Sequence, residues 1–142
     1  MSEHDRSKEH RLSLRAAGNY ATTLSDLKRY EEVKSLLRKP IRVARRVLGE
    51  GQSTTLTMKA IYADALYRDP SATLDDLRES VTTLEETKRT ARRVLGGAHP
   101  HLRVYEQSLR NARATLAARE TPSANAQRMP KNKQYKLTSS RA

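Results

Sequence analysis

The side chains that could carry metal or catalytic chemistry are few, and they are poorly grouped along the chain. The four histidines are His4 and His10 near the N-terminus, and His99 and His101 on either side of a proline. A His-x-His pair can bind a metal, but no further histidine, cysteine or acid cluster lies at ligand spacing. We interpret His99 and His101 as polar loop and helix-capping residues, and we expect no metal and no cofactor.

The acidic residues do not predict an active site either. The adjacent pairs Asp75-Asp76 and Glu85-Glu86 fall on predicted outer helix faces, where neighbouring residues do not face each other. Glu85 and Arg89 have the spacing and order of a favourable i,i+4 ion pair. The glycines end helical patterns and do not follow a strand, so they do not form a phosphate-binding loop. The sequence therefore predicts that the protein is not an enzyme.

The length and composition of the chain limit the kinds of fold it can adopt. The chain has 142 residues, of which 36% are hydrophobic and 31% are charged, and it contains no Cys, Trp or Phe. This length predicts one domain or one short array, and the absence of cysteine excludes disulfides. No apolar run approaches the ~20 residues that span a bilayer, and the N-terminus has no signal-peptide pattern. We therefore expect a soluble cytoplasmic protein without membrane contact.

An identical hexapeptide, Ala-Arg-Arg-Val-Leu-Gly, occurs at residues 44–49 and again at residues 91–96. Self-similarity of this kind is the signature of a repeat architecture. Each copy is typical of a helix end, because paired arginines oppose the negative pole of the helix dipole. A glycine after the last apolar residue also suits a left-handed conformation. The chain is therefore predicted to contain tandem helix pairs.

Apolar residues recur in steps of three and four, which predicts five helices. The first pair covers residues 12–49, the second covers residues 53–96, and a single helix covers residues 99–120. This last helix has one narrow apolar stripe, as expected of a helix that caps an array. The predicted fold class is all-α: a short α-solenoid of about two antiparallel helix pairs with a C-terminal capping helix.

Two local signals refine the helix boundaries. Pro40 falls inside the second helix, which we expect to continue through it with a bend. Thr73 and Asp76 have the spacing of a capping box at the start of the fourth helix.

The two ends of the chain lack this periodicity. Residues 1–11 are polar and are expected to be flexible, or to add a ragged first turn to the first helix. Residues 121–142 carry five bases and no acid, contain two prolines and are predicted to be a disordered basic tail. The net charge of +12 is thus divided between this tail and a mildly basic helical body.

The repeat resembles the tetratricopeptide repeat, in the long form found in kinesin light chains and light-chain-like proteins. The resemblance lies in Asn-Tyr-Ala at residues 19–21, Tyr-Glu-Glu-Val at residues 30–33 and the hexapeptide at residues 44–49, and it covers about residues 12–120. The junction Val-Leu-Gly-Gly-Ala-His-Pro at residues 94–100 is similar to the family's repeat ending. Val33 and Pro40 depart from the pattern, because they stand where the family has packing alanines.

The resemblance implies a protein-interaction scaffold or adaptor that binds an extended peptide on a concave face formed by the first helix of each pair. Asn19 matches the asparagine with which the family holds a peptide backbone, whereas the second repeat has Ile61 at that position. Helical spacing adds further residues to the same face. The predicted peptide-binding residues are Arg15, Asn19, Thr22, Asp26, Asp64 and Arg68.

Alternatives to this function stay open at the level of sequence. Each of these polar residues taken alone is equally well explained as solvated surface. The basic tail and helical body could bind nucleic acid without sequence specificity, although the chain carries no nucleic-acid reading motif. No heptad repeat precedes residue 12, so attachment to a motor is not expected. The chain could also self-associate or belong to a longer array, because two repeats are close to the minimum for stability.

Overall fold

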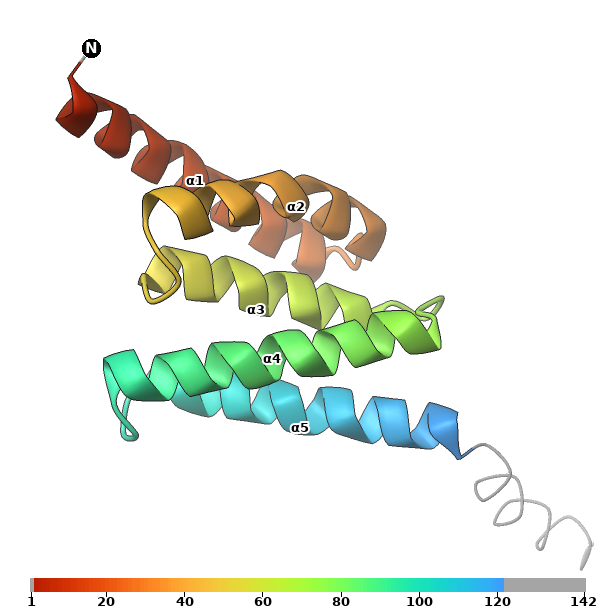
Figure 1. Cartoon of the computed structure of the whole chain (residues 1–142). Coiled ribbons are helices and arrows are strands. Elements are labelled where there is room, and N and C mark those ends of the chain that lie inside the picture. The colour runs from red at the N-terminus through yellow and green to blue at the C-terminus, as the bar shows by residue number, and fades with distance from the viewer. Residues whose placement is uncertain (1, 122–142) are drawn as a thin grey trace, which may run out of the picture.

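The computed structural model describes residues 2–121 and contains five α-helices, with no β-strand in that range (Figure 1). The fold class is therefore all-α, as predicted. The predicted disordered tail lies outside the described residues, apart from Thr121. The helices are α1 (Glu3–Asp26), α2 (Tyr30–Val47), α3 (Ser53–Arg68), α4 (Leu74–Leu95) and α5 (Pro100–Glu120).

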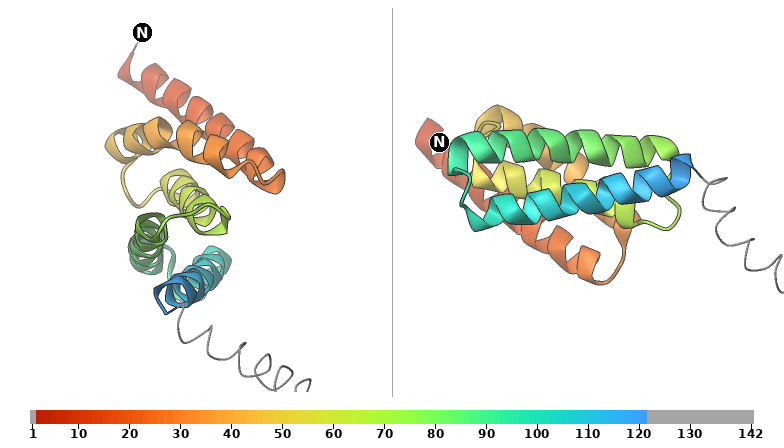
Figure 2. Two further views of the ribbon diagram at one scale, coloured as in Figure 1. Left: turned by 90° about the vertical axis from the view of Figure 1, so that its right-hand side faces the viewer. Right: turned by 90° about the horizontal axis from the view of Figure 1, so that it is seen from below.

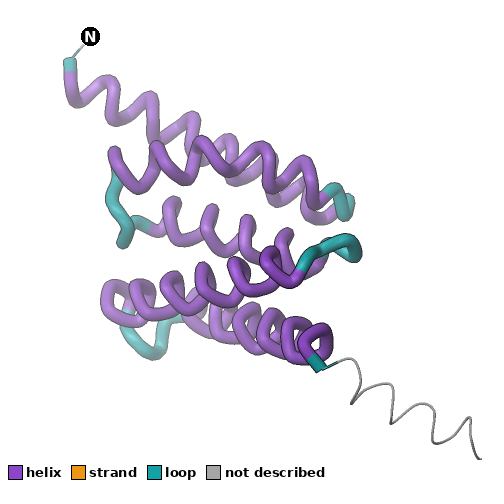
Figure 3. The backbone as a smooth tube through the Cα atoms, turned by 45° about the vertical axis from the view of Figure 1, so that its right-hand side comes forward, coloured by secondary structure: helices purple, strands orange, loops and turns teal. Residues whose placement is uncertain are grey.

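Each helix packs against the next one along the chain, and two further contacts join α1 to α3 and α3 to α5. Helices α2 and α4 do not pack against each other. As a result α1, α3 and α5 form one layer, and α2 and α4 lie over it (Figure 2). The short connections alternate between the two ends of the helices, so that successive helices run antiparallel (Figure 3).

The hydrophobic core has two parts, and α3 contributes to both. One cluster joins α3 to α4 and α5 around the fully buried Leu56, Leu77 and Leu84. The other joins α1 and α2 to the opposite side of α3, around Val33 and Leu37. Because α3 is apolar on two sides, it connects the two halves of the molecule.

Helix α1 begins at Glu3, so its predicted start at Leu12 is wrong. The hydroxyl of Ser2 accepts a hydrogen bond from the backbone N–H of Asp5 at 3.2 Å and caps the helix. Glu3 and Asp5 also place negative charge in the first turn, where the helix dipole favours it. These residues lie before Leu14, the first buried residue of α1, so apolar periodicity does not detect them.

The local signals at the other helix ends are confirmed. Helix α2 continues through Pro40, and Thr73 and Asp76 form a reciprocal capping box before α4. The two copies of the hexapeptide end α2 and α4, with φ angles of +97° at Gly49 and +90° at Gly96. Glycine is favoured at both positions, since a Cβ atom is strained at positive φ.

Some apolar residues in the predicted stripes are exposed. Tyr20 on α1, Leu27 directly after α1 and Val94 on α4 are at least half exposed. Among the described helices, α1 packs against α2 and α3 alone, so none of these helices covers the remainder of its apolar surface.

Candidate functional site

The layer formed by α1, α3 and α5 contains an open hollow of about 280 Å³ between α1 and α3. Three of the six predicted binding residues, Arg15, Asn19 and Thr22, lie along its α1 side. Their spacing of four and three residues places them on one face of the helix. The hollow is completed by Leu14 and Gly18 of α1 and by Thr54, Thr57 and Met58 at and near the start of α3.

The side chain of Asn19 is exposed and makes no hydrogen bond to any residue in the range 2–121. Its amide therefore has both a donor and an acceptor available to a ligand. Thr22 is more constrained, because its hydroxyl donates to the carbonyl of Gly18 at 3.0 Å. An oxygen lone pair of that hydroxyl stays available as an acceptor.

Gly18 leaves space in the middle of this hollow. A Cβ atom built on Gly18 would approach the Cγ atom of Met58 at 3.7 Å, which is an ordinary van der Waals distance. The glycine is thus not required by a tight helix contact, although it weakens the interior of a helix relative to alanine. Its effect is to keep the backbone of α1 accessible between Arg15 and Thr22.

Asp64 lies on the same face of α3 as Thr57, seven residues further along the helix. One of its carboxylate oxygens is buried and has no hydrogen-bond partner among residues 2–121. Burial raises the pKa of Asp64, while the hydroxyl of Ser108 on α5 and the charge of Arg68 oppose this shift. An acceptor without a donor costs free energy, so this oxygen destabilises the folded chain; it is closed to solvent and does not itself face a ligand.

The other two predicted residues lie at the ends of their helices. Arg68 is exposed at the last position of α3, with its guanidinium 5.9 Å from the centre of the Tyr67 ring. Asp26 is exposed at the last position of α1 and does not line the hollow. The structure therefore brings Arg15, Asn19 and Thr22 together, and it leaves Asp26 apart from them.

Sequence reasoning missed most of the α3 side of this site. Thr54 and Thr57 are polar residues near a helix start, where a capping role is the simplest explanation. The signal that could have identified them is the spacing Thr54, Thr57, Ile61, Asp64, which marks one face of a helix. Ser108 could not be found in this way, because its approach to Asp64 depends on how α5 packs on α3.

The remaining candidate residues have structural roles. Nδ1 of His99 accepts a hydrogen bond from the backbone N–H of His101 at 3.1 Å, so His99 caps α5 as predicted. Within residues 2–121 no group of three or more His, Asp and Glu side chains could hold a metal ion. In the same range, no helix combines the length and apolar character needed to cross a membrane.

Comparison with protein-family models, with curated proteins and with solved structures found no match to this chain.

Proposed function

We propose that the protein is an interaction scaffold, or adaptor, that binds an extended peptide on the face formed by α1, α3 and α5. In this proposal the helices are tetratricopeptide-like pairs, α1 with α2 and α3 with α4, and α5 is the capping helix. The proposal is supported by the alternating packing, in which the first helices of successive pairs touch and the second helices do not.

The observation that carries the proposal is the hollow lined by Arg15, Asn19 and Thr22. It presents polar side chains beside Gly18, which suit hydrogen bonds to the amides of a peptide. A peptide that lay along α1 would give the side-chain amide of Asn19 a partner, which it lacks among the described residues.

The test is selection of peptides from a random extended-peptide library by the full chain, at low and at moderate salt. A second selection uses a chain that ends at Glu120. We expect both chains to capture the same peptides, because the hollow lies entirely within α1 and α3. Capture that requires residues 121–142 and disappears with salt would contradict the proposal, because the basic tail would then be the binding element.

Two substitutions locate the site. Asn19→Ala removes the free amide and is expected to weaken peptide binding about tenfold, the effect of one or two hydrogen bonds. Gly18→Ala adds a methyl group to the hollow and is expected to weaken binding as well. Because alanine is the better helix former, Gly18→Ala should also raise the free energy of unfolding, by about 0.5–1 kcal/mol.

This opposite effect on stability separates a loss of binding from a loss of folding. The matched control is Thr82→Ala, at an exposed position on α4 outside the α1, α3 and α5 layer. We expect Thr82→Ala to leave peptide affinity unchanged. Equal affinity in all three variants would rule out the hollow as the binding site.

A further inference from the structure

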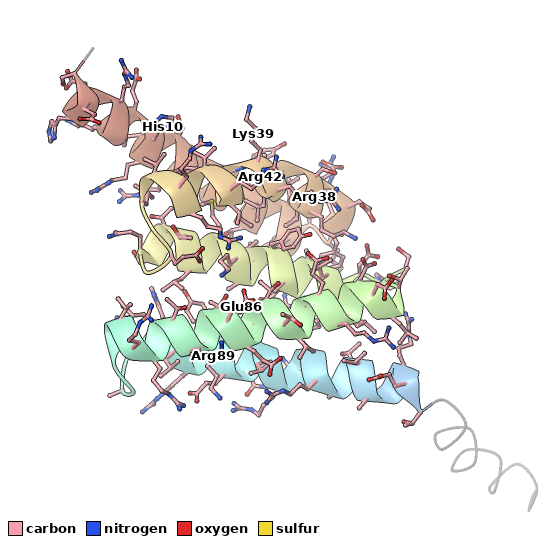
Figure 4. The ribbon with its side chains drawn as sticks, in the orientation of Figure 1. His10, Arg38, Lys39, Arg42, Glu86 and Arg89 are labelled. Carbon is pink, nitrogen blue, oxygen red and sulfur yellow. The ribbon has the colours of Figure 1, made fainter. Side chains whose placement is uncertain are left out.

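The opposite side of the molecule is formed by α2 and α4, and α2 carries an unusual concentration of positive charge, whereas α4 contains five acids and five bases. Residues 33–49 of the chain contain six bases and no acid. Five of these bases are exposed: Arg38, Lys39, Arg42, Arg45 and Arg46. Figure 4 shows Arg38 and Arg42 on the same side of the molecule as Glu86 and Arg89 of α4.

Most of these cations have no partner among the described residues. Lys39, Arg42 and Arg46 on α2 make no ion pair or hydrogen bond there, and the exposed Arg89 and Arg93 on α4 make none either. The predicted ion pair between Glu85 and Arg89 does not form; Glu85 lies 3.3 Å from Arg113 of α5 instead. Five cations are thus available to a ligand.

The arrangement on α2 is unfavourable for the isolated helix. Arg42 is four residues from Arg38 and from Arg46, and three residues from Lys39 and from Arg45. Like charges at these spacings destabilise a helix by about 0.2–0.5 kcal/mol per pair. The helix dipole favours Arg45 and Arg46 in the last turn, but Arg38 and Lys39 are in the middle of the helix. An anionic ligand would relieve this repulsion.

A hollow of about 200 Å³ lies next to this stripe, between α2 and α4. Its lining includes Arg38, Arg42, Arg45 and the buried Lys59 of α3, together with Glu79 and Glu86 of α4. The ammonium group of Lys59 is 3.4 Å from Glu50 and 3.7 Å from Glu86, so Glu86 pairs with Lys59. The exposed Arg38 and Arg42 are therefore the cations that this hollow presents to an anionic ligand.

We propose that the face formed by α2 and α4 binds the phosphate backbone of nucleic acid without sequence specificity. Guanidinium groups bind phosphates through paired N–H donors, and arginine predominates on this face. An acidic protein partner fits less well, because protein interfaces depend on buried aromatic and apolar anchors. None of the large hydrophobic residues that are exposed belongs to α2, which also leaves a membrane surface without an insertion point there.

The proposal is tested with the full chain, by fluorescence anisotropy of a labelled oligothymidylate of about 20 nucleotides and of a duplex of about the same length. The face variant is Lys39→Gln, Arg42→Gln and Arg89→Gln together. The control variant is Arg6→Gln, Arg11→Gln and Arg103→Gln together, at exposed positions outside this face. Each variant lowers the formal net charge from +12 to +9, by three charges.

We expect the face variant to weaken duplex binding at least tenfold, and to reduce the slope of log K against log salt by about 0.9 for each phosphate that is no longer neutralised. The control variant should change both quantities much less. The face variant should also be at least as stable as the parent chain, because like-charge repulsion on α2 and α4 has been reduced.

Three results would overturn the proposal. If duplex affinity falls equally in the two variants, binding depends only on net charge. If both variants keep the affinity of the parent chain, binding belongs to the basic tail. Displacement of the oligonucleotide by polyglutamate, or by phosphatidylserine vesicles, at the same concentration of negative charge would assign the face to an acidic protein or to a membrane.

Discussion

The ammonium group of Lys34 on α2 lies 3.1 Å from a carboxylate oxygen of Asp69, and both side chains are more than nine-tenths buried. The second oxygen of Asp69 accepts hydrogen bonds from the backbone N–H and the hydroxyl of Ser71. This pair fastens the connection between α3 and α4 to the start of α2. It therefore joins the two halves of the molecule at the end opposite to the loop between α2 and α3.

Removing one member of the Lys34–Asp69 ion pair is expected to destabilise the folded protein. Lys34→Ala leaves Asp69 buried beside hydrogen-bond donors but without its cation, and should lower the free energy of unfolding by about 3 kcal/mol. Urea denaturation measures this value. Lys39→Ala, at an exposed site on the same helix, should change it by less than about 0.5 kcal/mol.

A double-mutant cycle separates the pair from the general loss of side-chain packing. The combined variant Lys34→Ala with Asp69→Ala should be less destabilised than the sum of the two single variants, because it leaves no buried charge behind. The other partner of Lys34, Glu31 at 2.9 Å, keeps its charge but is 75% exposed. Strict additivity would show that the ion pair contributes no coupling.

The same carboxylate predicts how stability depends on pH. The backbone N–H and the hydroxyl of Ser71, and then Lys34, hold the pKa of Asp69 below its ordinary value of 3.8. A lowered pKa in the folded state means that the unfolded chain binds a proton more readily. The stabilisation is therefore complete above pH 3.8 and is lost as the pH falls through the folded-state pKa.

Comparison of the parent chain with Asp69→Asn, by urea denaturation between about pH 6 and about pH 3, checks this dependence. The parent should be the more stable protein at the upper end of this range, and the difference should narrow in acid. If the difference in the free energy of unfolding between the two proteins does not change with pH, the protonation of Asp69 is not coupled to folding.

Pro40 is expected to reduce the stability of α2. Proline lacks the N–H that would bond to the carbonyl of Leu36, and its ring crowds the preceding turn. Pro40→Ala should restore this hydrogen bond and raise the free energy of unfolding by about 1–3 kcal/mol, after allowance for the greater freedom of the unfolded chain. A loss of stability would instead mean that packing of α2 on α1 and α3 depends on the proline.

The glycine that ends each copy of the hexapeptide is expected to resist substitution. Gly96 has φ of +90° and ψ of 160°, with free space around the position of a Cβ atom, so the cost of Gly96→Ala is conformational and should be about 1–3 kcal/mol. Gly97 also has free space and does not have a φ in the positive range. Gly97→Ala is therefore the matched control and should be neutral or slightly stabilising. Thermal unfolding followed by circular dichroism compares the stability of the two variants. Equal losses of stability in Gly96→Ala and Gly97→Ala would contradict the conformational explanation.

The sequence by itself determined the number of helices and most of their boundaries. The signals that worked are local: the repeated hexapeptide with its terminal glycine, the capping box of Thr73 and Asp76, and the three-four apolar spacing. Each depends on residues within one or two turns of each other, so no knowledge of the other helices is required. The start of α1 at Glu3 was missed because it is set by a polar cap rather than by burial.

The tertiary structure alone decided which helix faces meet. Periodicity placed Arg15, Asn19 and Thr22 on one face of α1, but the opposing Thr57 and Met58 follow from the packing of α3. Lys34 is an ordinary base in the sequence and becomes buried because Asp69, 35 residues away, reaches it. Glu85 pairs with Arg113 of α5 rather than with Arg89 of its own helix. Helical spacing fixes positions within one helix, whereas the crossing of two helices depends on side chains and loops from both.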